Sequence, residues 1–194
     1  MKKIKGKLLM TAAEIDLVLA RISAEIVEKL GPRDEFAIIG IRRRGVPLAE
    51  RLRRKLEAIL KRAIPFGILD INLYRDDLTT ISNRPMLRET LIDFDINDLS
   101  VILVDDVLYT GRTIRAALDG IVDLGRPKKV QLAVLVDRGL RELPIQADYV
   151  GKHIQTSNDE IVEVRLEEED QEERVVLLKR PQPAPVTEET GKKK

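Results

Sequence analysis

The chain has 194 residues, with 34 lysines and arginines against 33 aspartates and glutamates. This length suits one domain, the hydrophobic fraction of 43% supplies a core, and the net charge of +1 provides no overall field that would attract nucleic acid. Cysteine is absent and His153 is the only histidine, which excludes disulfide scaffolds and thiolate metal sites and disfavours a Ser/His/Asp triad. Any chemistry must therefore use carboxylates, hydroxyls, guanidinium groups and backbone amides.

The sequence predicts a cytoplasmic protein without a membrane segment. No stretch approaches the roughly 20 apolar residues of a membrane span, and the basic start of the chain is interrupted at Thr11 before a signal-peptide core can form. We expect one folded domain over residues 1–179. The end of the chain, 180–194, is rich in Pro, Glu, Thr and Lys, which is typical of a disordered tail.

Predicted strands and helices alternate along the chain. Thr11 and Glu14 fit a capping box that opens a helix ending near Leu30. Continuous apolar runs predict buried strands at 36–41, 67–74, 100–104 and 130–136. Amphipathic runs predict further helices at 46–60 and 113–124, and 161–166 and 174–178 are expected to pair as extra strands around a solvated acidic turn. This alternation favours an α/β fold with a mainly parallel central sheet flanked by helices.

The most informative segment runs from Val101 to Thr113. Its apolar start places Asp105 and Asp106 at the carboxyl end of a strand, where open α/β sheets bind ligands. The short stretch Tyr109–Thr113 then opens a helix, whose first amides and dipole favour a phosphate. Carboxylates for hydroxyls beside amides for a phosphate describe a sugar phosphate site. The acidic pair alone equally fits a capped turn or the metal pocket of a phospho-acceptor domain.

The whole segment resembles the phosphoribosyl-diphosphate (PRPP) motif of the type I phosphoribosyltransferases. This resemblance implies that Asp105 and Asp106 hold the ribose hydroxyls and act in catalysis. It also implies that the 5-phosphate lies against the loop that follows, and that the PRPP-binding residues include Val107, Leu108, Tyr109, Thr110, Gly111, Arg112 and Thr113.

Two further basic segments suit the diphosphate of PRPP. Arg42, Arg43 and Arg44 stand between glycines after the first buried strand, where three guanidinium groups can meet a diphosphate, although a solvated basic turn is the alternative. The polar stretch 75–88 is the expected flexible lid that keeps water from the reacting sugar, with Arg75 as a catalytic candidate and Arg88 as a diphosphate candidate. A plain disordered connection fits the composition of this stretch as well.

A narrower resemblance, to the PyrR family of pyrimidine operon regulators that are also uracil phosphoribosyltransferases, is carried by the segments 70–78, 136–145 and 147–152. It implies a type I phosphoribosyltransferase fold with a small hood, transfer from PRPP to uracil giving UMP and diphosphate, and Mg2+ that binds through PRPP near the acidic pair. It also implies a homodimer or higher oligomer. We assign the base pocket to Asp137, Arg138 and a backbone contact of Val162, although a salt-bridged turn fits these residues equally well.

Many members of this family bind the leader of pyrimidine mRNA in response to UMP, and the chain departs from them there. Ala20, Ala24, Leu140 and Gln146 stand where threonine, histidine and arginine are usual, whereas Arg141 remains. Each lost contact is typically worth about 1–3 kcal/mol. Two alternatives to a uracil transferase therefore stay open: an RNA-binding attenuation regulator with vestigial catalysis, and a transferase that acts on another base.

Overall fold

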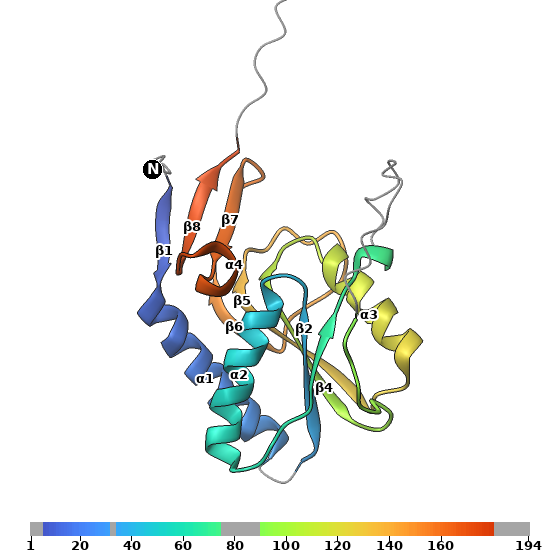
Figure 1. The fold of residues 1–194 in the computed structure, drawn as a ribbon. Helices are drawn as coiled ribbons and strands as arrows, with labels where there is room; N and C mark the ends of the chain where they lie inside the picture. Colours follow the sequence, from blue (N-terminus) through green and yellow to red (C-terminus); the bar gives the residue numbers. More distant parts are fainter. Residues whose placement is uncertain (1–5, 32–33, 75–89, 181–194) are drawn as a thin grey trace, which may run out of the picture.

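The computed structural model describes residues 6–31, 34–74 and 90–180. A five-stranded sheet with helices on both faces forms the body of the molecule, and a smaller three-stranded sheet stands at its upper end in Figure 1. The predicted α/β fold is confirmed. The predicted lid loop 75–88 lies outside the described residues, as does the predicted tail except for Arg180. None of the described helices is long and apolar enough to span a membrane.

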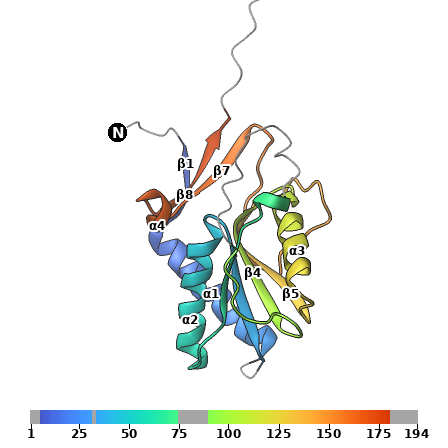
Figure 2. The same cartoon turned by 45° about the vertical axis from the view of Figure 1, so that its right-hand side comes forward.

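The main sheet is parallel throughout and has the strand order β3-β2-β4-β5-β6. Its strands are β2 (Phe36–Ile41), β3 (Phe66–Leu69), β4 (Ser100–Leu108), β5 (Lys129–Asp137) and β6 (Tyr149–His153). Helices α1 (Ala12–Leu30) and α2 (Gly45–Leu60) cover one face, and α3 (Arg112–Leu124) covers the other (Figure 2). Because side chains alternate along a strand, Ile38 enters one core and Ile39 the other. Burial on both faces explains the continuous apolar runs of the sequence.

The predicted capping box at the start of α1 is present. The Thr11 amide donates to Glu14 Oε2 at 2.7 Å, and the Glu14 amide donates to Thr11 Oγ1 at 3.3 Å. The helix ends at Gly31, whose φ of +83° lies in the region that favours glycine. Ile15, Leu19 and Ile22 lie on the buried face of this helix, as the periodicity predicts.

Two strand predictions near the site are corrected by the structure. The predicted strand 67–74 ends at Leu69, because Asp70 Oδ1 accepts the Asn72 amide at 2.9 Å and turns the chain into a short 3₁₀ helix, η1 (Asn72–Tyr74). In contrast, β4 continues beyond Val104 to Leu108, because its pairing with β5 persists through the acidic pair. Asp105 and Asp106 therefore belong to the strand itself.

Two strands have no counterpart among the predicted elements. Strand β1 (Lys7–Thr11) buries only Met10, so its apolar pattern is weak, and it forms by pairing with β8 (Arg174–Lys179). Strand β6 is the edge of the main sheet and exposes its last two residues, Lys152 and His153. Tertiary pairing rather than local pattern defines both strands.

The smaller sheet, which we call the hood, has the antiparallel order β1-β8-β7, with β7 spanning Glu160–Arg165. The predicted pairing of the two C-terminal strands is therefore confirmed. The acidic turn between them has no buried residue, so the prediction that it is solvated is confirmed. It forms the short helix α4 (Glu167–Asp170), and the prediction missed its ion pairs, in which Asp170 binds Arg44 and Glu168 binds Arg51. The hood also packs Val164 and Val175 into the core under α1 and α2.

Candidate active site

A cleft of about 460 Å³ opens where β2, β3 and β4 end. It brings together the predicted acidic pair and the predicted arginine loop, which are far apart in the sequence. Such a mixture of carboxylates and guanidinium groups suits a ligand that carries both hydroxyls and a polyanion. The lining consists of Arg42, Arg43, Arg44, Asp70, Ile71, Asn72, Asp105, Asp106, Val107 and Thr113.

The acidic pair concentrates negative charge at the end of β4. Asp105 is only 6% exposed and its Oδ1 accepts the Asp106 amide at 2.9 Å, while Asp106 Oδ1 accepts the Val107 amide at 2.8 Å. Burial raises the pKa of Asp105 well above its usual value, and the charge of Asp106 adds to this rise. Burial also raises the pKa of Asp106, against the Val107 amide and the charge of Arg44, which oppose the rise. A bound cation or hydroxyl donor would relieve this accumulation of charge.

The arginine loop approaches β4 very closely. The Arg42 amide donates to the Leu69 carbonyl at 3.0 Å, which continues the pairing of β2 with β3, and the Arg42–Arg43 peptide bond is cis. At Gly45, the first residue of α2, a Cβ atom would lie 2.4 Å from the Val104 carbonyl oxygen. Glycine at this position thus allows the loop to lie beside the acidic pair.

The loop between β4 and α3 is tied to the segment that follows β5. Gly111 caps α3 with a φ of +93°, and the Thr110 carbonyl accepts the amides of Glu142 and Leu143 at 3.0 Å each. Arg112 Nε reinforces this contact by donating to Glu142 Oε2 at 2.7 Å. The loop therefore presents the start of a 13-residue helix in a defined orientation, which is an arrangement suited to a phosphate.

The predicted PRPP residues differ in how they meet the cleft. Val107 and Thr113 line it, whereas Tyr109, Thr110, Gly111 and Arg112 lie outside its lining. Leu108 is 1% exposed and packs into the core under α3, so only its backbone is available to a ligand. The acidic pair and the arginine loop are thus the predicted groups that the structure brings face to face.

Asp137, the first predicted base contact, forms hydrogen bonds with residues that follow it closely in the chain. Its carboxylate accepts Arg141 Nη2 at 2.6 Å and the Gly139 amide at 2.9 Å. Burial alone would raise the pKa of Asp137, but these hydrogen bonds outweigh it and lower the pKa. This carboxylate therefore stays ionised and orders the turn after β5.

The other two predicted base contacts lie outside the lining of the cleft. Arg138 is 4% exposed, lies 4.1 Å from the centre of the Tyr109 ring, and donates to the carbonyls of Ser157 and Glu160 at 3.0 and 2.9 Å. It thus joins the loop before α3 to the chain that enters the hood. Val162 is buried in β7 within the core under α1 and α2, which leaves only its backbone for a ligand.

Comparison with known proteins agrees with this architecture. The family model for the phosphoribosyl transferase domain matches residues 10–169. "Bifunctional protein PyrR" of Pelotomaculum thermopropionicum is 60% identical over 160 residues, which cover 82% of this chain and 88% of the relative. The protein of the same name from Thermus thermophilus is 55% identical over 172 residues, covering 89% and 95%. The chain belongs to the PyrR family of phosphoribosyltransferases.

Solved structures show the same fold at low sequence identity. A hypoxanthine-guanine phosphoribosyltransferase from Bacillus anthracis is 19% identical, with a TM-score of 0.66 and coverage of 91% of this chain and 99% of that one. The hypoxanthine phosphoribosyltransferase of Trypanosoma cruzi, also 19% identical, has a TM-score of 0.64 and covers 90% and 97%. The predicted type I phosphoribosyltransferase fold is therefore confirmed.

Sequence reasoning gave no role to two aspartates that the PyrR-family structure places at the site. Asp70 lines the cleft at 9% exposure, and its Oδ2 has no hydrogen-bond partner among the described residues. The position of Asp70 could have been predicted from the sequence, because this residue follows a strand at the same edge of the sheet as Asp105. Asp170 reaches the cleft wall by binding Arg44 from the hood, a contact that no local pattern indicates.

Asp105→Asn is expected to stabilise the folded protein near neutral pH, because it removes a buried charge and keeps an oxygen that can accept the Asp106 amide. A raised pKa means that the folded state binds the proton more tightly than the unfolded state, whose value is near 3.8. The stability of the unmodified protein therefore rises as pH falls from above the raised pKa toward 3.8, and the advantage of the variant shrinks over that window. Urea unfolding from pH 7 to pH 4 measures this difference.

The exposed Asp93 provides the matched control, since Asp93→Asn removes the same charge from a solvated position. Its effect should stay within about 0.5 kcal/mol at every pH. A urea midpoint for Asp105→Asn that equals the unmodified protein at pH 7 would contradict the assignment of a buried charge.

Proposed function

We propose that the protein transfers ribose 5-phosphate from PRPP to uracil, giving UMP and diphosphate. One observation carries the proposal: two carboxylates and a loop of three arginines line a single cleft. Ribose hydroxyls donate to carboxylates, and a diphosphate accepts from guanidinium groups. The resemblance to the PyrR family, and relatives named "Bifunctional protein PyrR", support uracil as the base.

The topology supports one orientation of PRPP. Because β2 and β4 are paired in parallel, with Gly40 opposite Val104, the loops that follow them lie side by side. We place the diphosphate against Arg42–Arg44, the ribose hydroxyls against Asp105 and Asp106, and the 5-phosphate against the loop Tyr109–Thr113. In this orientation, the arginine loop and the loop Tyr109–Thr113 bind opposite ends of one PRPP molecule.

The reaction needs positioning and charge stabilisation more than a protein nucleophile. The bond between C1 and the diphosphate oxygen breaks with its electrons passing to diphosphate, uracil N1 bonds to C1, and N1 passes its proton to an oxygen of the departing diphosphate. The carboxylates of Asp105 and Asp106 hold the ribose while positive charge develops on the sugar. Arg75 and Arg88, assigned to the lid, lie outside the described residues and their roles stay predictions.

The donor set of the cleft fits magnesium. The carboxylates of Asp105 and Asp106, and the Oδ2 atom of Asp70 that has no hydrogen-bond partner among the described residues, are hard oxygen donors of the kind Mg2+ prefers. The described residues contain no group of three or more histidine, cysteine or acidic side chains that would hold a metal by themselves. We therefore infer that the ion arrives with PRPP. When bound, Mg2+ neutralises the diphosphate as a leaving group.

We propose that Asp137, Arg138 and Val162 shape the base pocket, and that their side chains do not contact the base. Uracil presents two carbonyls and an N3–H, which backbone groups can read. Arg138 holds the carbonyls of Ser157 and Glu160, so it orders a wall rather than offering its guanidinium to the base. Val162 would contribute only backbone atoms.

A phosphoribosyl transfer assay with PRPP, Mg2+ and a panel of bases tests the proposal. Uracil should be converted to UMP, and hypoxanthine, guanine and orotate should not react. The double variant Asp105→Asn with Asp106→Asn should lower kcat/KM for PRPP by about 100-fold or more, since it weakens two hydrogen bonds to charged groups. Asp93→Asn serves as the control. Unchanged turnover in the double variant would refute the sugar assignment, and transfer to another base would refute the choice of uracil.

A second candidate function is RNA recognition, with catalysis as the primary activity. One groove of about 400 Å³ joins Arg21 and Glu25 of α1 to Asp137 and Gln146, and the family resemblance assigns these two regions to RNA. Ala20 and Ala24 lie exposed on α1. The groove also contains the carboxylates of Glu25, Asp137 and Asp148. Because the chain lacks the histidine that is usual at Leu140 and the arginine that is usual at Gln146, we expect RNA binding to be weak and to tighten with UMP.

A gel shift with a pyrimidine-operon leader RNA, with and without UMP, measures this activity. The variant Leu140→His with Gln146→Arg adds the groups that are usual at two exposed positions, so it should bind about fivefold more tightly or better. A scrambled RNA is the control, and the salt dependence of binding shows whether the added charge meets phosphate. Absence of UMP-enhanced binding in both proteins would reject the regulator function.

A further inference from the structure

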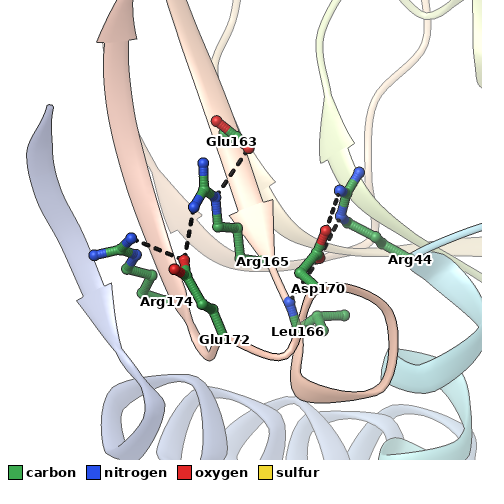
Figure 3. Close-up of polar contacts among 7 residues, drawn as sticks. All are labelled: Arg44, Glu163, Arg165, Leu166, Asp170, Glu172 and Arg174. Carbon is green, nitrogen blue, oxygen red and sulfur yellow. Dashed lines mark hydrogen bonds and ion pairs between the residues drawn. The ribbon is translucent and has the colours of Figure 1, made fainter. Parts of the chain in front are cut away.

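Arg44 connects the cleft to the hood. It is the last residue before α2 and lines the cleft, yet its Nε and Nη2 atoms donate to the two oxygens of Asp170 at 3.0 and 2.7 Å (Figure 3). The side chains are 33% and 20% exposed, so the pair is largely shielded from water. A bidentate pair of this kind fixes the plane of the guanidinium as well as its distance.

Asp170 is itself held in place before it meets Arg44. Its Oδ2 accepts the Leu166 amide at 3.0 Å, and its own amide donates to the Leu166 carbonyl at 2.7 Å. The neighbouring residues Arg165, Glu172 and Arg174 bind one another in a separate network on the hood (Figure 3). Among the described ion pairs, Asp170 is the hood carboxylate that reaches a residue of the cleft.

The guanidinium of Arg44 thus interacts with the carboxylates of both Asp170 and Asp106. The hydrogen bonds that Arg44 donates to Asp170 raise the pKa of Arg44, and the attraction of Asp106 adds to the rise. In turn, the charge of Arg44 opposes the rise that burial causes in the pKa of Asp106. The position in which Asp170 holds Arg44 therefore bears on the charge of the acidic pair.

A second contact holds the hood independently of this pair. Arg51 lies two helical turns after Arg44 on α2, and it binds Glu173 at 2.5 Å and Glu168 at 2.6 Å. Val164 and Val175 of the hood are also buried in the core under α1 and α2. Loss of the Asp170 carboxylate should therefore free Arg44 without releasing the hood.

We propose that Asp170 is a positioning residue for PRPP, which holds Arg44 at the wall of the cleft, beside Asp106 and facing the diphosphate. The proposal rests on the proposed transfer from PRPP. An arginine side chain has much rotamer freedom, and an arginine that is already fixed loses less of it when it binds a phosphate. The opposite role, in which Asp170 competes with diphosphate for Arg44, predicts an effect of opposite sign.

Asp170→Asn tests the proposal, with Glu169→Gln on the same short helix as its matched control, since Glu169 is exposed and forms no ion pair among the described residues. Asp170→Asn should raise KM for PRPP by about tenfold and leave kcat and KM for uracil within about twofold. Glu169→Gln should change none of the three parameters. A lower KM for PRPP, or an equal change in both variants, would overturn the proposal.

A double-mutant cycle with Arg44→Lys separates positioning from general damage. Lysine cannot form the bidentate pair, so Asp170→Asn should have no further effect on KM for PRPP in the Arg44→Lys background. A purely structural role would lower Tm and persist in both backgrounds, and that result would also overturn the proposal.

Calorimetric titration of each protein variant with PRPP, in the presence of Mg2+ and without any base, tests this inference separately from the proposed function. Weaker PRPP binding by Asp170→Asn than by Glu169→Gln supports the positioning role, even if no base accepts the ribose phosphate. Equal PRPP binding by the two variants refutes the positioning role, even if uracil transfer is demonstrated.

Discussion

The buried negative charge at the end of β4 is the constraint on which the rest of the site depends. Two adjacent carboxylates lie in a poorly solvated position, burial raises the pKa of each, and each accepts a hydrogen bond from the amide of the next residue. Such a site is completed by what it binds. In the proposed function, sugar hydroxyls would donate hydrogen bonds to the two carboxylates, and the magnesium ion that arrives with the diphosphate would supply the positive charge that offsets them.

The fold brings compensating charge to this point by close backbone packing. Parallel pairing of β2 with β4 sets the arginine loop beside the carboxylates, and Gly45 permits an approach that a Cβ atom would block. The hood then closes one side through Asp170, so that a residue distant in sequence influences Arg44. The arginine loop, the acidic pair and the hood are therefore linked through a few side chains.

The local pattern of apolar and polar residues predicted much of this architecture, and it failed where tertiary contacts determine the bounds of an element. The strand and helix on either side of the Asp105 segment follow from an apolar run and an amphipathic run, both of which are readable in sequence, whereas the extension of β4 to Leu108 depends on its pairing with β5. The end of β3 depends on one hydrogen bond that Asp70 accepts from the Asn72 amide, and β1 exists because β8 pairs with it. Arg44 and Asp170 are 126 residues apart, so no periodicity could indicate their pairing.

A structure of the protein with PRPP and Mg2+ bound, in the absence of a base, tests the central claim most directly. The account predicts the ribose 2- and 3-hydroxyls within hydrogen-bond distance of Asp105 and Asp106, with the diphosphate at Arg42–Arg44 and the 5-phosphate at the start of α3. PRPP bound in the reverse orientation, or outside the cleft between these loops, would contradict it.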